Sequence, residues 1–73
     1  MNISYPDDQL IGKLVLSNNI LGVVTDPCTF KGLRTGYYYI EWPDFIEYYS
    51  PNQIREMIDN LEEYMSEHEE DNH

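Results

Sequence analysis

The hydrophobic residues in the first fifty positions follow a period close to two, which predicts β-strands. Residues 36–42 are the strongest candidate, because aromatic and β-branched side chains dominate them. Apolar runs at 10–16 and 20–25 flank a Ser-Asn-Asn turn, and residues 45–49 return after a Pro-Asp turn. We interpret residues 26–36, which hold a proline and two glycines, as a longer connection. The pattern predicts four or five short strands.

After residue 50 the apolar period changes to that of an α-helix. Ser50 has the position of an N-cap, Pro51 follows it, and Gln53 completes a capping box. One apolar stripe then continues at helical spacing through Ile54, Met57, Ile58, Leu61 and Met65. We expect this stripe to pack on the sheet, and a free helix that binds in a groove is the alternative.

These elements predict an α+β fold, with a small antiparallel sheet of four or five strands followed by one C-terminal amphipathic helix. The chain leaves no room for a parallel crossover, so the sheet is expected to be antiparallel and either curled or closed. We expect one domain over 1–66, in which the sheet occupies about 10–49 and the helix about 51–66. Residues 67–73 are interpreted as an acidic, flexible tail.

Four short motifs share their layout with a known class of small barrels. They are Ile-Gly-Lys-Leu-Val at 11–15, Leu-Gly-Val-Val-Thr at 21–25, Tyr-Tyr-Ile-Glu-Trp-Pro-Asp at 38–44 and Glu-Tyr-Tyr at 47–49. The layout resembles SH3-like and Tudor-like barrels, including short barrel proteins encoded by tailed phages. The resemblance covers about residues 10–50 and implies a small barrel. Because such barrels bind proteins, peptides, methylated lysines or nucleic acid, function has to be argued from the surface.

Charge changes the picture, because 14 acidic residues oppose four basic ones in 73 positions and the net charge is −10. Such a chain repels nucleic-acid phosphates and anionic membranes, so we expect neither as a direct partner. The charge is also uneven. Residues 1–50 carry six acids and three bases, whereas residues 51–73 carry eight acids and one base, Arg55.

On the predicted helix, Glu56, Asp59, Glu63, Glu67 and Glu70 fall on one stripe away from the apolar one. Successive members stand about 5 to 6 Å apart along the axis, a spacing of the order of that between phosphates on one strand. A solvated outer face is the alternative interpretation. The stripe favours a partner site, because only Arg55 and Asp59 have the spacing of an i,i+4 ion pair.

Our first hypothesis is a small, acidic, non-enzymatic interaction protein from a phage or mobile element. It would bind a basic surface of a host protein that handles nucleic acid, and inhibit or redirect that protein as a DNA mimic does. The expected helix contacts are Glu56, Asp59, Glu62, Glu63 and Glu67. We expect Glu41, Asp44 and Glu47 to extend this patch.

A second hypothesis is a Tudor-like reader or adaptor, in which aromatic residues hold a peptide or a methylated side chain. The candidate cluster is Tyr37, Tyr39, Trp42 and Tyr49. Core packing and cross-strand pairing are the alternative roles for these rings. A third hypothesis is a structural subunit of a larger assembly, such as a homodimer formed through an open sheet edge.

Catalysis, metal binding and cofactors are not expected. The histidines, His68 and His73, are in the charged tail, so no base lies near Cys28 in the sequence. We therefore interpret Cys28 as a small buried or half-buried residue and not as a nucleophile. Residues 67–73 contain metal-capable groups without a ligand spacing. A lone cysteine and an N-terminus without signal-peptide features predict the cytoplasm, that of the host cell if the source is a phage.

Overall fold

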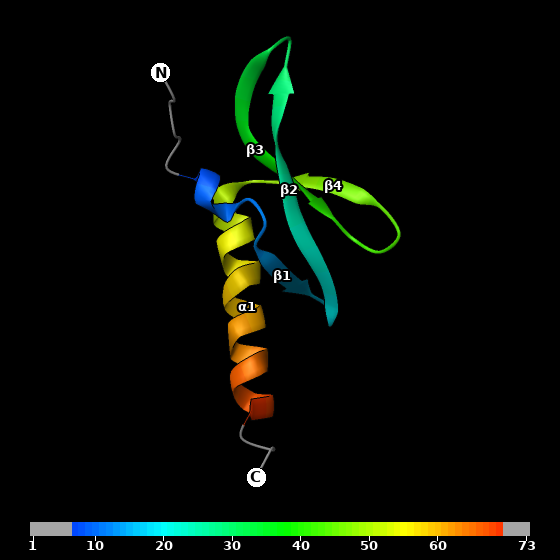
Figure 1. Ribbon diagram of the computed structural model, residues 1–73, viewed down its shortest axis with the longest axis vertical. Coiled ribbons are helices and arrows are strands. Elements are labelled where there is room, and N and C mark those ends of the chain that lie inside the picture. The colour runs from blue at the N-terminus through cyan, green and yellow to red at the C-terminus, as the bar shows by residue number, and fades with distance from the viewer. Residues whose placement is uncertain (1–6, 70–73) are drawn as a thin grey trace.

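The computed structural model describes residues 7–69, with side chains through Glu67, and shows an α+β fold (Figure 1). In chain order its elements are the 3₁₀ turn η1 (Asp8–Leu10), β1 (Leu14–Ser17), β2 (Ile20–Phe30), β3 (Leu33–Glu41), β4 (Ile46–Tyr49) and α1 (Pro51–Glu69). The four strands form one antiparallel sheet in the order β1-β2-β3-β4. β1 and β4 are its two edges, so the sheet is unclosed. The predicted α+β layout is confirmed.

Two predicted boundaries in the first half of the chain are wrong. The expected strand at 10–16 begins only at Leu14, because η1 and a turn occupy the residues before it. The expected connection at 26–36 is instead a two-stranded extension of β2 and β3, here called the ribbon (residues 25–37). Its turn, Lys31-Gly32, has positive φ at both residues (53° and 81°), the geometry that matches the twist of a tight hairpin.

The proline in the ribbon fits because of its place in the sheet. The pairing of β2 with β1 extends from Ile20 to Val23 and leaves Pro27 on a free edge of the sheet. A proline at a free edge removes no hydrogen bond between strands. In a central strand it would remove one, and the sheet would be destabilised. The β2–β3 register is also irregular on both sides of Pro27, and such bulges discourage edge-to-edge pairing with other chains.

The core lies between the sheet and the first half of α1. Tyr38, Ile40 and Trp42 alternate along the chain and are buried on the face that α1 covers, while Tyr37 and Tyr39 are exposed on the other face. The remaining core members come from η1, β1, β2 and α1: Leu10, Val15, Val24, Ile54 and Met57.

The start of α1 confirms the predicted capping box. Ser50 Oγ accepts the backbone N–H of Gln53 at 3.3 Å, and Gln53 Oε1 accepts that of Ser50 at 3.0 Å. The helix packs mainly on β1, as expected for a stripe that faces the sheet. Burial fades along the stripe, since Ile54 is fully buried and Met65 is exposed. α1 continues to Glu69, beyond the predicted end at about residue 66.

An N-terminal clamp joins η1 to the ribbon and the helix. Asp8 Oδ1 accepts hydrogen bonds from the Tyr38 hydroxyl at 2.8 Å and from Arg34 Nη2 at 2.5 Å. Asp7 pairs with Arg55 on α1. Three segments far apart in sequence therefore meet at residues 7–8.

The molecule is elongated, with extents of 50 × 29 × 17 Å. Its radius of gyration is 14.0 Å, whereas a compact domain of this length has about 11 Å. The ribbon tip forms one end of the long axis and the C-terminal end of α1 forms the other (Figure 1). Within residues 7–69, no helix is long and apolar enough to span a membrane.

Candidate interaction surfaces

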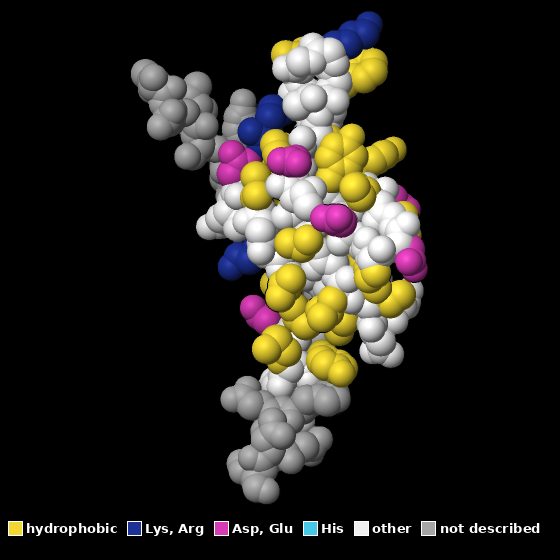
Figure 2. Space-filling view, turned by 45° about the vertical axis from the view of Figure 1, so that its right-hand side comes forward, with side chains coloured by type: hydrophobic (Ala, Val, Ile, Leu, Met, Phe, Trp, Pro, Cys, Tyr) yellow, Lys and Arg dark blue, Asp and Glu magenta, His cyan; other side chains and the backbone are white. Residues whose placement is uncertain are grey.

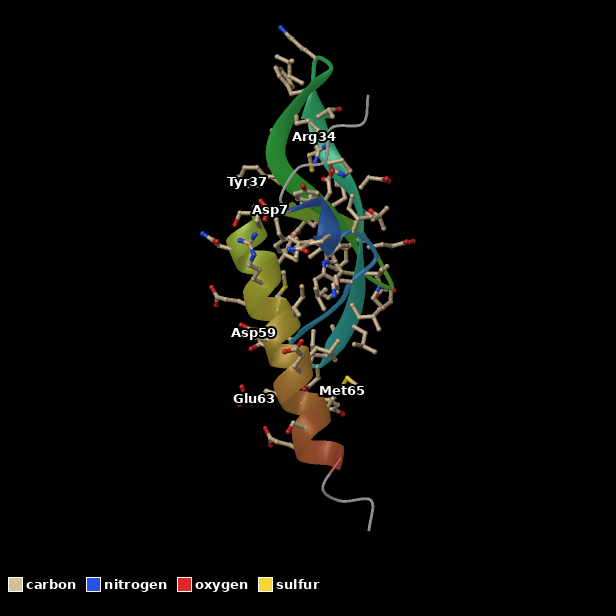
Figure 3. The ribbon with its side chains drawn as sticks, turned by 60° about the vertical axis from the view of Figure 1, so that its left-hand side comes forward. Asp7, Arg34, Tyr37, Asp59, Glu63 and Met65 are labelled. Carbon is tan, nitrogen blue, oxygen red and sulfur yellow. The ribbon has the colours of Figure 1, made fainter. Side chains whose placement is uncertain are left out.

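The first candidate surface is the acidic face of α1. Its members are all exposed: Glu56, Asp59, Glu62, Glu63 and Glu67. Asp59 and Glu63 point away from the sheet, whereas Met65 lies on the other side of the helix (Figure 3). Arg55, the one Lys or Arg in this helix, pairs with Asp7 and donates to Asn52 Oδ1 at 3.3 Å. Arg55 therefore does not neutralise the acidic face of its own helix.

The other three acids of the predicted patch lie in two places. Glu47 accepts a hydrogen bond from the Tyr49 hydroxyl at 3.2 Å, and Tyr49 borders a shallow hollow together with Glu56. Asp44 borders a different hollow, whose lining includes Tyr49 but no residue of α1. Glu41 pairs in register with Val23 and Ile46 on the opposite face of the sheet. Of the three acids, the structure thus links only Glu47 to the helix, through Tyr49.

The four predicted aromatic residues separate into two pairs. Trp42 and Tyr49 form an edge-to-face contact on the covered face, with ring centroids 6.1 Å apart, and Trp42 Nε1 donates to the Tyr49 hydroxyl at 3.2 Å. Burial raises the pKa of Tyr49, partly offset by the hydrogen bond from Trp42. Tyr37 and Tyr39 lie on the other face. The structure does not bring the four rings into one cage.

A different aromatic group forms on the exposed face. Tyr37 meets Tyr48 edge to face at 5.6 Å, and both line a hollow of about 450 Å³ at the base of the ribbon. We call it the ribbon hollow, and its lining is Cys28, Thr29, Phe30, Thr35, Tyr37, Tyr39 and Tyr48. Sequence reasoning missed Phe30 and Tyr48. Tyr48 was missed because its place beside Tyr39 depends on the register between β3 and β4, which the alternation within either strand does not show.

A bulge in β3 shapes this hollow. Opposite Cys28, β3 contains the extra residues that the register shift requires, and Gly36 there has a φ of 94°. Thr35 Oγ1 donates to the Cys28 carbonyl and accepts the N–H of Tyr37, both at 3.3 Å. Bulges re-aim side chains, and Tyr37 is one of the residues within this bulge.

Cys28 is the only buried group of nucleophilic type in the hollow. Burial raises the pKa of its thiol, and a hydrogen bond with Tyr39 lowers it to a smaller extent. The thiol is therefore held in its protonated, weakly nucleophilic form. Among the described side chains, no three His, Cys, Asp or Glu are grouped as metal ligands. The predicted tail at 67–73 lies mostly outside the described residues.

No protein-family model, curated protein or solved structure matches this chain.

Proposed function

We propose that this chain is a small, non-enzymatic interaction protein whose acidic face binds a basic surface on another protein. The partner is of the kind that handles nucleic acid, and binding inhibits or redirects it as a DNA mimic does. The observation that supports this function is the exposure of all five acids of the face, while Arg55 pairs with Asp7.

Physical chemistry favours such a partner. Unpaired acids one helical turn apart repel one another, an arrangement that helix stability alone does not favour. A basic cleft relieves this repulsion, and the field of the acidic face speeds the encounter at low ionic strength. Because the contacts are exposed, salt weakens them over a distance of about 8 Å at physiological ionic strength.

The wider setting belongs to the same proposal. The motif layout supports kinship with SH3-like or Tudor-like barrels, including those that phages encode. An acidic surface that binds a host protein is consistent with a phage or mobile-element source. The lone cysteine is consistent with the host cytoplasm as the place of action.

The experiment is capture of host proteins on the immobilised chain, with three arms. Added double-stranded DNA should release the captured partner, because both ligands need the same basic cleft. High salt should release it as well. The double variant Asp59→Asn/Glu63→Gln should weaken binding of the purified partner by roughly 2- to 30-fold, from about 0.2–1 kcal/mol per exposed charge pair.

A matched control removes the same number of charges elsewhere. Asp26→Asn/Glu41→Gln changes two exposed acids outside α1, one in β2 and one on the sheet face opposite the helix. It should leave the affinity nearly unchanged. Equal weakening by both variants would show that bulk charge, not the acidic face, attracts the partner. Capture that DNA does not compete would contradict DNA mimicry.

A further inference from the structure

The two ends of the long axis differ in charge. Residues 20–40, which include the ribbon, carry two bases and one acid. Residues 51–69, which form α1, carry one base and six acids. The charge is therefore uneven along the molecule, with a net charge of +1 over residues 20–40 and −5 over residues 51–69.

The ribbon end is apolar as well as basic. Phe30 is 66% exposed and Leu33 is 74% exposed on either side of the tight turn. Lys31 Nζ lies 5.5 Å from the centroid of the Phe30 ring. Phe30 also forms one wall of the ribbon hollow, so an open aromatic cavity and a lysine lie at the same end.

The helix end continues the apolar stripe past the body of the protein. We define it as Leu61, Tyr64 and Met65, with exposed fractions of 42% for Tyr64 and 57% for Met65. The exposed acids Glu62, Glu63 and Glu67 surround it. Figure 2 shows hydrophobic side chains at both ends of the described molecule, at the ribbon tip beside a basic side chain and at the lower end of the helix.

We propose that the helix end of one copy docks in the ribbon hollow of a second copy. A flexible methionine fills irregular space and its sulfur contacts aromatic rings favourably, which suits Met65 against Tyr37 and Tyr48. Lys31 of the receiving copy would then meet the acids around the docked helix end. The hollow lies on the sheet face opposite the one that α1 covers, so the helix end of a chain does not reach the hollow of the same chain.

This contact joins two different surfaces, so it is heterologous. Each copy in a pair keeps one unused hollow or one unused helix end, and further copies add to form a chain or a closed ring. Each contact would place a part of one copy with a net positive charge, residues 20–40, against the strongly negative helix of another copy.

The test uses the purified chain alone, so it is independent of the partner proposed above. Sedimentation velocity over a range of concentrations should show mass rising above one chain. Tyr48→Glu in the hollow and Met65→Glu at the helix end, both exposed positions, should each reduce the protein to a single chain. Mixing the two variants should restore a dimer, because one supplies an intact hollow and the other an intact helix end.

Ile46→Glu is the matched control, since Ile46 is 59% exposed on the same sheet face but does not line the hollow. It should assemble like the unchanged chain. Circular dichroism verifies that every variant is folded. A single chain at all concentrations would overturn the proposal. So would assembly lost in Ile46→Glu, or a variant mixture that stays monomeric, because a symmetric contact is not restored by mixing.

Discussion

Gly22→Ala should be among the most damaging small substitutions in this protein. Gly22 lies in β2, where a Cβ atom would be 2.6 Å from Trp42 Cε3 and 2.9 Å from Ile40 Cγ2. Ordinary carbon–carbon contacts are about 3.5–4.0 Å, so the ring would have to retreat by about 1 Å. Trp42 has little freedom to do so, because it is 5% exposed and its Nε1 is bonded to Tyr49.

The magnitude follows from overpacking a core. Extra methyl groups in a filled site cost about 1–3 kcal/mol, and a locked indole places this site at the upper end. A domain of this length has roughly 4–11 kcal/mol of stability, so a loss of about 3 kcal/mol is a large share. At about 4–8 °C per kcal/mol, the melting temperature should fall by about 12–24 °C.

Urea denaturation followed by tryptophan fluorescence measures the loss in the free energy of unfolding, because Trp42 is the only tryptophan in the chain. Gly32→Ala is the control, since its Cβ would meet open space and only the strain of a φ of 81° remains. That strain costs about 1 kcal/mol. If Gly22→Ala lowers the free energy of unfolding no more than Gly32→Ala does, the close approach of Gly22 and Trp42 does not limit packing.

Three further outcomes are expected. Ser50→Ala should lower the free energy of unfolding by about 1 kcal/mol, measured by urea denaturation, because the capping bond to Gln53 is lost. Burial raises the pKa values of Tyr38 and Tyr49, so unfolding should become easier as pH rises above about 10, where the unfolded tyrosines ionise first. Titration of stability should show this slope shrinking in Tyr38→Phe or Tyr49→Phe, and an unchanged slope would contradict it. Cys28 should react with a thiol reagent more slowly in the folded chain than in urea, with its rate midpoint shifted to higher pH; equal rates would contradict its burial.

Local signals in the sequence were enough for the helix and for the strongest strand. The capping box at Ser50 and the alternation in residues 36–42 each depend on neighbours within a few positions, and the structure confirms both. The ribbon was missed for the opposite reason. Pro27 is acceptable in β2 only because β1 ends before it, and that fact depends on pairing between distant segments.

For the candidate surfaces too, local spacing predicted some residues, whereas others depended on pairing between distant segments. Helical spacing was sufficient to place Asp59 and Glu63 on one exposed face. The aromatic residues could not be sorted in this way, because the faces of β3 and β4 are matched by their register. That register sets Tyr48 beside Tyr39 and sends Tyr49 to the covered face with Trp42.

The N-terminal clamp has a consequence for folding kinetics. Asp8 bonds to residues 26 and 30 positions later, and Asp7 to one 48 positions later. Contacts that close such long loops are costly in chain entropy before the rest of the structure forms, so we expect the clamp to close after the sheet and helix have met. An interaction that forms late contributes to the barrier against unfolding and little to the rate of folding. We therefore expect residues 7–8 to prolong the lifetime of the folded state with little effect on the rate of folding.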